Sequence, residues 1–176
     1  MKTADTASTR NAAKGPDAYS DPAWWYDIRG FLILTGTYQV TLWNHLAFFA
    51  RNLRRRHLEA AVGSGTFLAL TLATNRILGR KNPEAVVGID YAARMLKGAK
   101  RLFRRRPAVK LLQADLSQIE FADNYFDSVN IAHSFHAFPE PDRVLRELHR
   151  VMAPGATLFV DVLLCPRGSR LRRVLA

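Results

Sequence analysis

The chain has a single cysteine, Cys165, and so cannot form an internal disulfide bond. A chain of 176 residues with one thiol suits a reducing compartment. The apolar stretch that a secretory signal would need after Met1 and Lys2 is also missing. We therefore expect a cytoplasmic protein, in which Cys165 is a small apolar residue near a strand end rather than a nucleophile.

Acidic residues are scarce, with 15 Asp and Glu against 26 Lys and Arg, which gives a formal net charge of +11. The basic residues gather at 51–56, 97–106 and 167–173. Such clusters can meet nucleic acid or anionic lipid. No aromatic platform or recognised nucleic-acid module accompanies them. We therefore do not expect nucleic acid as the main partner, and we retain peripheral membrane contact as an option.

Long uninterrupted apolar runs are absent as well. The most apolar segment, 31–50, is broken by polar residues such as Thr35, Gln39 and Asn44, so we expect no transmembrane span. By length the chain is a single domain that can bury a core. We divide it into a disordered tail at 1–20, a helical cover at 21–56 and a folded core at 57–176.

The most informative stretch is the one from His57 to Thr66. An apolar run led by Glu59 enters a Gly-Ser-Gly turn, and the apolar segment 67–78 that follows has helical character. This pattern predicts a buried parallel strand that leads through a tight loop into a helix. A dinucleotide-binding turn would need a glycine where Leu68 stands, and a P-loop would need a lysine after Gly65. The turn therefore favours neither a nicotinamide dinucleotide nor a nucleoside triphosphate as its ligand.

The same stretch resembles motif I of the class I S-adenosylmethionine-dependent methyltransferases, an acidic residue followed by spaced glycines, with Ala61 in the first glycine slot. Further segments match that family in order. They are 85–90, a strand closed by Asp90; 109–116, similar to the third strand; 121–129, close to Phe-x-Asp-x-x-Phe-Asp-x-Val; and 151–158, similar to Val-Leu-Lys-Pro-Gly-Gly-x-Leu. Over 58–162 the chain is identified as a member of the small-molecule branch of this family.

The resemblance implies an α/β fold, a Rossmann-like doubly wound sheet of about five parallel strands with helices on both faces and an N-terminal helical cover. It implies S-adenosylmethionine as cofactor and S-adenosylhomocysteine as product. By this resemblance, Asp90 would accept hydrogen bonds from the ribose hydroxyls and Asp115 would accept one from the exocyclic amine of adenine. An aromatic residue of the cover would close the pocket. The implied cofactor residues are Tyr26, Glu59, Ala61, Gly63, Gly65, Asp90, Tyr91, Met95, Asp115, Leu116 and Ala132.

The implied reaction is an in-line displacement at the sulfonium methyl, in which the protein mainly aligns the acceptor and excludes water. His133 and His136 follow the fourth strand at the carboxyl edge, where open sheets bind ligands, and either can act as a base at neutral pH. His45 and His149 are assigned to the cover and to a helix face. No metal site is predicted.

The C-terminus departs from the family pattern, because too few residues follow the fifth strand to form strands six and seven. An uncovered edge strand is a liability, so we expect a second copy or a partner subunit to cover it. Three functions remain open. They are methyl transfer to a small, apolar or aromatic acceptor, a non-catalytic methyltransferase-fold subunit that regulates a partner, and a basic RNA-binding or RNA-modifying protein.

Overall fold

A computed structural model describes residues 41–162. The predicted tail at 1–20, most of the predicted cover, Tyr26 and the segment after Val162 lie outside these residues. The elements follow in the order α2 (Leu42–Ala50), β1 (Arg56–Ala60), α3 (Thr66–Ile77), β2 (Ala85–Asp90), α4 (Ala93–Phe103), β3 (Val109–Gln113), β4 (Phe126–Ile131), η3 (Phe135–Ala137), α5 (Pro141–Val151) and β5 (Met152–Val160).

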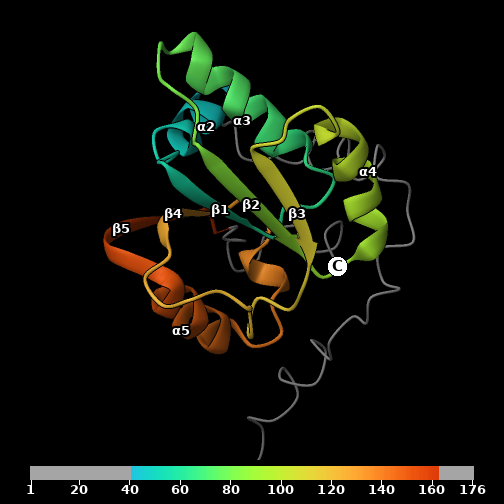
Figure 1. Cartoon of the computed structure of the whole chain (residues 1–176), viewed down its shortest axis with the longest axis vertical. Coiled ribbons are helices and arrows are strands. Elements are labelled where there is room, and N and C mark those ends of the chain that lie inside the picture. The colour runs from blue at the N-terminus through green and yellow to red at the C-terminus, as the bar shows by residue number, and fades with distance from the viewer. Residues whose placement is uncertain (1–40, 163–176) are drawn as a thin grey trace, which may run out of the picture.

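The strands form one sheet of five, in the order β3-β2-β1-β4-β5, and every neighbouring pair is parallel (Figure 1). The chain runs outward from β1 to β3 and then returns to place β4 on the other side of β1. This reversal creates a switch point at the carboxyl ends of β1 and β4, where open α/β sheets bind ligands. The predicted Rossmann-like fold with five parallel strands is confirmed.

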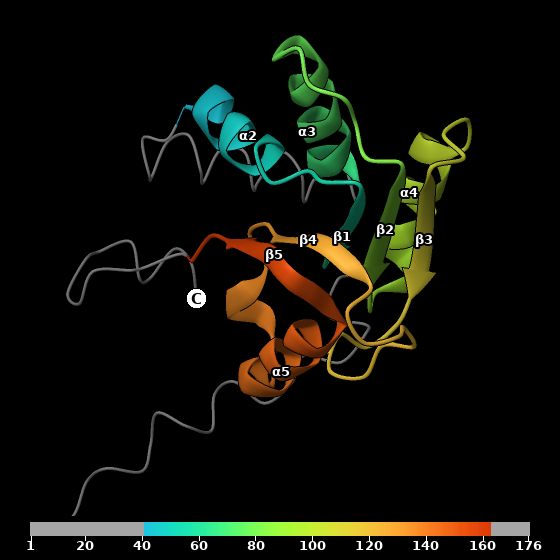
Figure 2. The same cartoon turned by 60° about the vertical axis from the view of Figure 1, so that its left-hand side comes forward.

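Helices cover both faces of the sheet. Figure 2 shows α2 and α3 on one side and α5 on the other. On the α5 side, Leu58 and Val129 of the central strands pack with Val144 and Leu148 of the helix. On the opposite side, the buried residues of α3 and α4 form a second cluster with β2, made up of Val62, Leu68, Leu72, Val86, Leu96 and Phe103. The sheet is therefore the middle of three layers.

The face of β1 that points toward α2 is polar rather than apolar. His57 is fully buried, and its Nδ1 lies 2.8 Å from Ser128 Oγ and its Nε2 3.2 Å from Glu59 Oε2. Asn52, which follows α2, donates from Nδ2 to the Val129 carbonyl at 2.8 Å. Because buried polar groups need partners, this network ties the segment after α2 to the central strands.

The bounds of α3 agree with the predicted helical segment 67–78 to within about a residue. Within the segment 109–116 that matches the third strand of the family, β3 covers Val109–Gln113, and the matching residues after it lie in the loop. There the Ala114 N–H bonds the Asp90 carbonyl at 3.2 Å, and Asp115 Oδ1 accepts the Ser117 N–H at 2.8 Å. The first bond still joins the chain to the end of β2, and the second belongs to the turn that follows.

Candidate cofactor and acceptor site

The turn after β1 holds a series of left-handed residues. Ala61, Gly63 and Gly65 have φ of 59°, 57° and 79°. A Cβ on Gly65 would lie 2.8 Å from Phe103 Cε2 and 3.1 Å from Ala99 Cβ, so this glycine allows the close approach of α4. A Cβ on Gly63 would meet only Met95 Cε, at 3.7 Å. The backbone at Gly63 is therefore less closely packed than the backbone at Gly65.

Asp90 joins this turn to the end of β2. Its Oδ2 accepts the Gly63 N–H at 2.7 Å and its Oδ1 accepts the Ala92 N–H at 2.8 Å. Burial raises the pKa of Asp90, while the N–H groups of Ala92 and Gly63 oppose that rise. Each carboxylate oxygen has a further lone pair after one backbone bond, so Asp90 can still accept hydroxyl donors.

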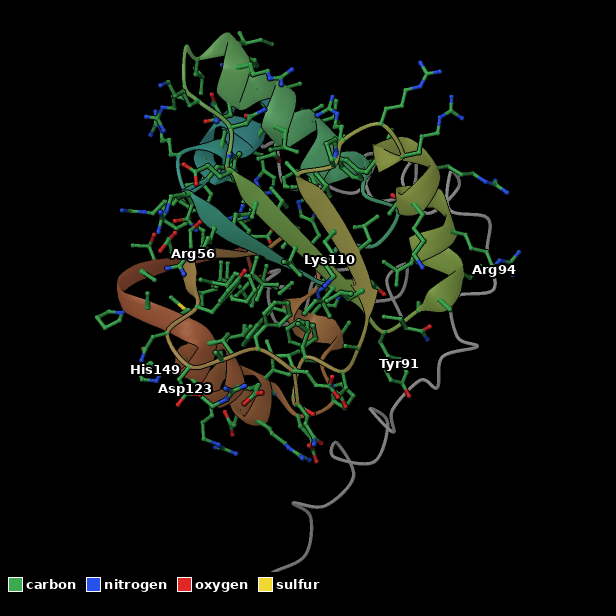
Figure 3. The ribbon with its side chains drawn as sticks, viewed as in Figure 1. Arg56, Tyr91, Arg94, Lys110, Asp123 and His149 are labelled. Carbon is green, nitrogen blue, oxygen red and sulfur yellow. The ribbon has the colours of Figure 1, made fainter. Side chains whose placement is uncertain are left out.

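The structure brings several of the other implied cofactor residues to the same edge. Met95 is buried beneath Gly63 at the start of α4, and Tyr91 is 57% exposed between β2 and α4. Figure 3 shows the Tyr91 side chain directed outward from this connection. Asp115 is exposed after β3, whereas Leu116 is part of the core on the α5 side. Ala132, which is buried, follows β4.

Glu59 is the implied cofactor residue whose surroundings differ most from that role. Its side chain is inside the protein, with 3% exposure. Its Oε2 lies 3.2 Å from His57 Nε2 and 3.5 Å from Asn130 Nδ2. These contacts give Glu59 a structural place in the buried polar network, and its contact with cofactor stays a prediction.

A second group of polar side chains gathers past the ends of β4 and β5. His133 Nε2 lies 2.6 Å from His45 Nε2 on α2, and Asp161 Oδ2 lies 3.2 Å from His45 Nε2 and 3.1 Å from His133 Nε2. Asp161 Oδ1 also accepts the His133 backbone N–H at 2.5 Å. We call His45, His133 and Asp161 the His-His-Asp cluster. It joins three separate elements at the carboxyl edge of the sheet.

The surroundings of this cluster shift its acid–base behaviour. Burial lowers the pKa of His133 to about 4, against the attraction of Asp161. Burial acts to raise the pKa of Asp161, but the imidazoles of His45 and His133 hold it below its ordinary value. The Phe67 ring lies edge-on to both histidines, with centroids 5.6 Å from His45 and 4.8 Å from His133. The polar atoms of the cluster therefore lie beside an aromatic side chain, that of Phe67.

Of the two histidines predicted as bases, only His133 is part of the cluster. His136 lies on η3 and is exposed. Sequence reasoning assigned His45 to the cover alone and did not single out Asp161. The available signal for Asp161 was its place at the end of the fifth strand, on the edge where the other site residues gather.

The order of the sheet, the glycine turn and the acidic end of β2 define a class I methyltransferase fold. The methyltransferase domain family matches residues 58–160, more than half of the chain, so the chain belongs to this family. Within residues 41–162, no helix is both long and apolar enough to cross a bilayer.

The names of two curated relatives refer to methylation in menaquinone or ubiquinone biosynthesis. The chain is 38% identical to demethylmenaquinone methyltransferase of Thermus thermophilus over 68% of its own length and 58% of the relative. It is 30% identical to ubiquinone/menaquinone biosynthesis C-methyltransferase UbiE of Azotobacter vinelandii, over 94% of its length and 65% of the relative. The chain thus spans less than two thirds of either protein.

A solved structure supports the fold. A SAM-dependent methyltransferase from Aquifex aeolicus superposes with a TM-score of 0.61 at 23% identity, covering 80% of this chain and 71% of that one.

Proposed function

We propose that this chain transfers the methyl group of S-adenosylmethionine to a small-molecule acceptor of the quinone class. The observation that carries the proposal is the link between Asp90 and the Gly63 turn, within a segment that matches the methyltransferase domain from 58 to 160. The names of the relatives support a quinone-class acceptor.

The residues of the turn fit this cofactor. The backbone at Gly63 is less closely packed than that at Gly65, and the Asp90 carboxylate beside it has lone pairs for hydroxyl donors. Tyr91, Met95, Asp115, Leu116 and Ala132 would hold the rest of the molecule, with Tyr26 as an aromatic cap from outside the described residues. When bound, the cofactor supplies a methyl group on a sulfonium, which is a good leaving group.

The acceptor is expected at the carboxyl ends of β4 and β5. Aromatic side chains lie there: Phe48 of α2 stacks on Phe159 of β5 with ring centroids 4.6 Å apart, and Phe67 stands beside His133. Trp43 and Phe48 are 47% and 42% exposed. Such a surface favours an apolar, ring-containing acceptor. A methyl electrophile needs an electron-rich partner, so the reduced quinol is the acceptor form we propose.

His136 and His133 differ in what they can do for this acceptor. The Nε2 atom of His133 already faces His45 and Asp161, whereas His136 is exposed on η3. Of the two, His136 is therefore the better candidate for taking a proton directly from an acceptor. His133 is better placed to orient groups at the site.

We also propose that another chain, a second copy or a partner subunit, covers the outer edge of β5. In the described part of the chain β5 ends the sheet and pairs only with β4. Exposed edges invite pairing, so proteins cover them. Light scattering that gives the mass of a monomer for a preparation active by itself would contradict this. We propose a cytoplasmic location, with the apolar acceptor drawn from a membrane surface.

The function is tested by transfer of a labelled methyl group from S-adenosylmethionine to a chemically reduced naphthoquinol with an apolar side chain. We expect labelled product from the chain as it stands, none from Asp90→Ala, and unchanged yield from Asp123→Asn, which lies beside α5 (Figure 3). Cofactor binding without transfer to the quinol would refute the acceptor class. A folded protein that binds no cofactor would instead favour the non-catalytic subunit.

A further inference from the structure

We propose that the His-His-Asp cluster is a binding site for a divalent transition-metal ion. Among residues 41–162 this is the group of histidine and acidic side chains whose ligand atoms lie close enough together to share an ion. Its three members come from α2, from the residue two past β4 and from the residue after β5.

The distances between the three ligand atoms fit the face of a coordination polyhedron. They are 2.6 Å between the two Nε2 atoms, and 3.2 and 3.1 Å from these to Asp161 Oδ2. Nitrogen and oxygen ligands about 2.1 Å from zinc stand about 3.4 Å apart in a tetrahedron. In an octahedron adjacent ligands stand about 3.0 Å apart. A central ion therefore requires the two Nε2 atoms to separate from 2.6 Å by about 0.4 Å for an octahedral site or about 0.8 Å for a tetrahedral one.

Hydrogen bonding within the cluster does not account for the same arrangement. Asp161 Oδ2 is buried, and none of its contacts in the described part of the chain has hydrogen-bond geometry. A proton shared between the two facing Nε2 atoms is directed along the line that joins them, and Asp161 Oδ2 lies off this line, 3.2 and 3.1 Å from the two nitrogens. A cation between the three atoms would satisfy all of them at once, as buried polar atoms require.

The surrounding structure holds the ligands in place. Asp161 Oδ1 accepts the His133 N–H, so the same carboxylate orients one histidine through its backbone and faces its ring with the other oxygen. His133 has a φ of 58°, an uncommon conformation for a histidine, which costs about 1 kcal/mol or more unless its surroundings fix it. The two imidazole rings lie 4.7 Å apart at 16°. Strain of this kind is typical of ligand sites.

The ligand types select the class of metal. Two imidazoles with one carboxylate suit zinc, iron(II), manganese, cobalt and nickel better than calcium or magnesium, which prefer oxygen ligands alone. Three protein ligands leave one or more positions for water or another oxygen. The side chains of His45, Asp161 and His133 keep 15, 16 and 24% exposure, so an ion can enter. If the proposed function holds, a quinol oxygen is the natural occupant of an open position.

The site is tested with metal alone on protein that carries no polyhistidine tag. Calorimetric titration with Zn²⁺ is expected to show one equivalent bound with a dissociation constant of about 1 µM or lower. Co²⁺ is expected to give visible d–d absorption on binding. His45→Gln, His133→Asn and Asp161→Asn should each weaken binding by at least about tenfold. Asparagine tolerates the left-handed backbone at 133, and at 161 it keeps the oxygen that accepts the His133 N–H.

The matched controls are His149→Ala and Asp142→Asn, which change exposed side chains of α5 outside the cluster and should leave metal binding unchanged. A folded protein that binds no equivalent of Zn²⁺ would overturn the proposal and leave the cluster as a proton-sharing group. Equal losses in the control variants would overturn it as well. Titration with S-adenosylmethionine in the presence of a chelator separates this proposal from the proposed function, because cofactor binding should survive removal of the metal.

Discussion

The carboxylate of Asp90 accepts the backbone N–H of Gly63 at 2.7 Å, which joins the end of β2 to the turn after β1. The two residues are 27 positions apart in the chain. The bond fixes the backbone of the turn at Gly63 and places a carboxylate beside it. We propose that cofactor binding depends on the same side chain that joins β2 to the turn.

Gly65→Ala should destabilise the fold by about 2–4 kcal/mol, because the new methyl adds a clash with Phe103 to a strained backbone. Gly79→Ala is the matched control. Gly79 has a similar φ of 72°, but a Cβ there meets nothing within 4 Å. Its cost should be about 1 kcal/mol. Urea unfolding measures both, and equal losses would refute the packing role of Gly65.

Asn52→Ala should lower the free energy of unfolding by about 2–4 kcal/mol, since it leaves buried partners without a donor. Asn52 is 1% exposed, and it bonds the Val129 carbonyl, Asn130 and Thr157. Asn44→Ala, on the exposed side of α2, should change stability by no more than about 0.5 kcal/mol. Thermal unfolding of the two variants tests whether the polar network around Asn52 stabilises the attachment of α2 to the central strands.

Asp127 should make stability depend on pH in the acid range. Its carboxylate accepts the Arg56 N–H at 2.9 Å and pairs with the guanidinium at 3.0 Å, and these bonds hold its pKa below the ordinary value of 3.8. Because the folded pKa is the lower one, this stabilisation is complete above the ordinary value and is lost as pH falls through the folded pKa.

Denaturation of the Asp127→Asn variant at a series of pH values measures this contribution. Compared with the unaltered chain, the variant should lose less stability between neutral pH and pH 3, while Arg55 and the other carboxylates remain in both proteins. Parallel pH profiles would show that Asp127 contributes nothing.

His136→Ala should slow methyl transfer to the quinol at least about tenfold if this exposed imidazole takes a proton, with little change in cofactor affinity. His149→Ala, on α5, is the control and should act like the unaltered chain. A rate that does not change in His136→Ala would remove His136 as a base.

The sheet could be predicted from the sequence because the segments of its strands match the family motifs in order, with a glycine turn after β1 and an apolar run closed by an acidic residue at β2. Asp90 could be found in the same way, since it closes such a run. Gly65 was interpreted through ligand approach alone, and its packing against Phe103 could not be seen without the position of α4.

The His-His-Asp cluster could not be predicted from spacing. His45 and His133 are 88 residues apart, and His133 and Asp161 are 28 apart. No local period brings such residues together. They meet because β4 and β5 are parallel neighbours that end at one edge, and because α2 lies against that edge beside α3. For Glu59 the motif was visible in the sequence, but the surroundings of the side chain were not. The motif implied a cofactor residue, and in the structure the carboxylate of Glu59 contacts His57 and Asn130.

The most direct measurement is calorimetric titration with S-adenosylmethionine and S-adenosylhomocysteine, on the unaltered chain, on Asp90→Ala and on the Asp123→Asn control. We predict binding at about micromolar concentration, unchanged in Asp123→Asn and lost in Asp90→Ala samples that remain folded by circular dichroism. Asp90→Asn, which keeps one acceptor oxygen, should show an intermediate affinity. A folded, unaltered chain that binds neither compound would contradict the account, as would undiminished binding by Asp90→Ala.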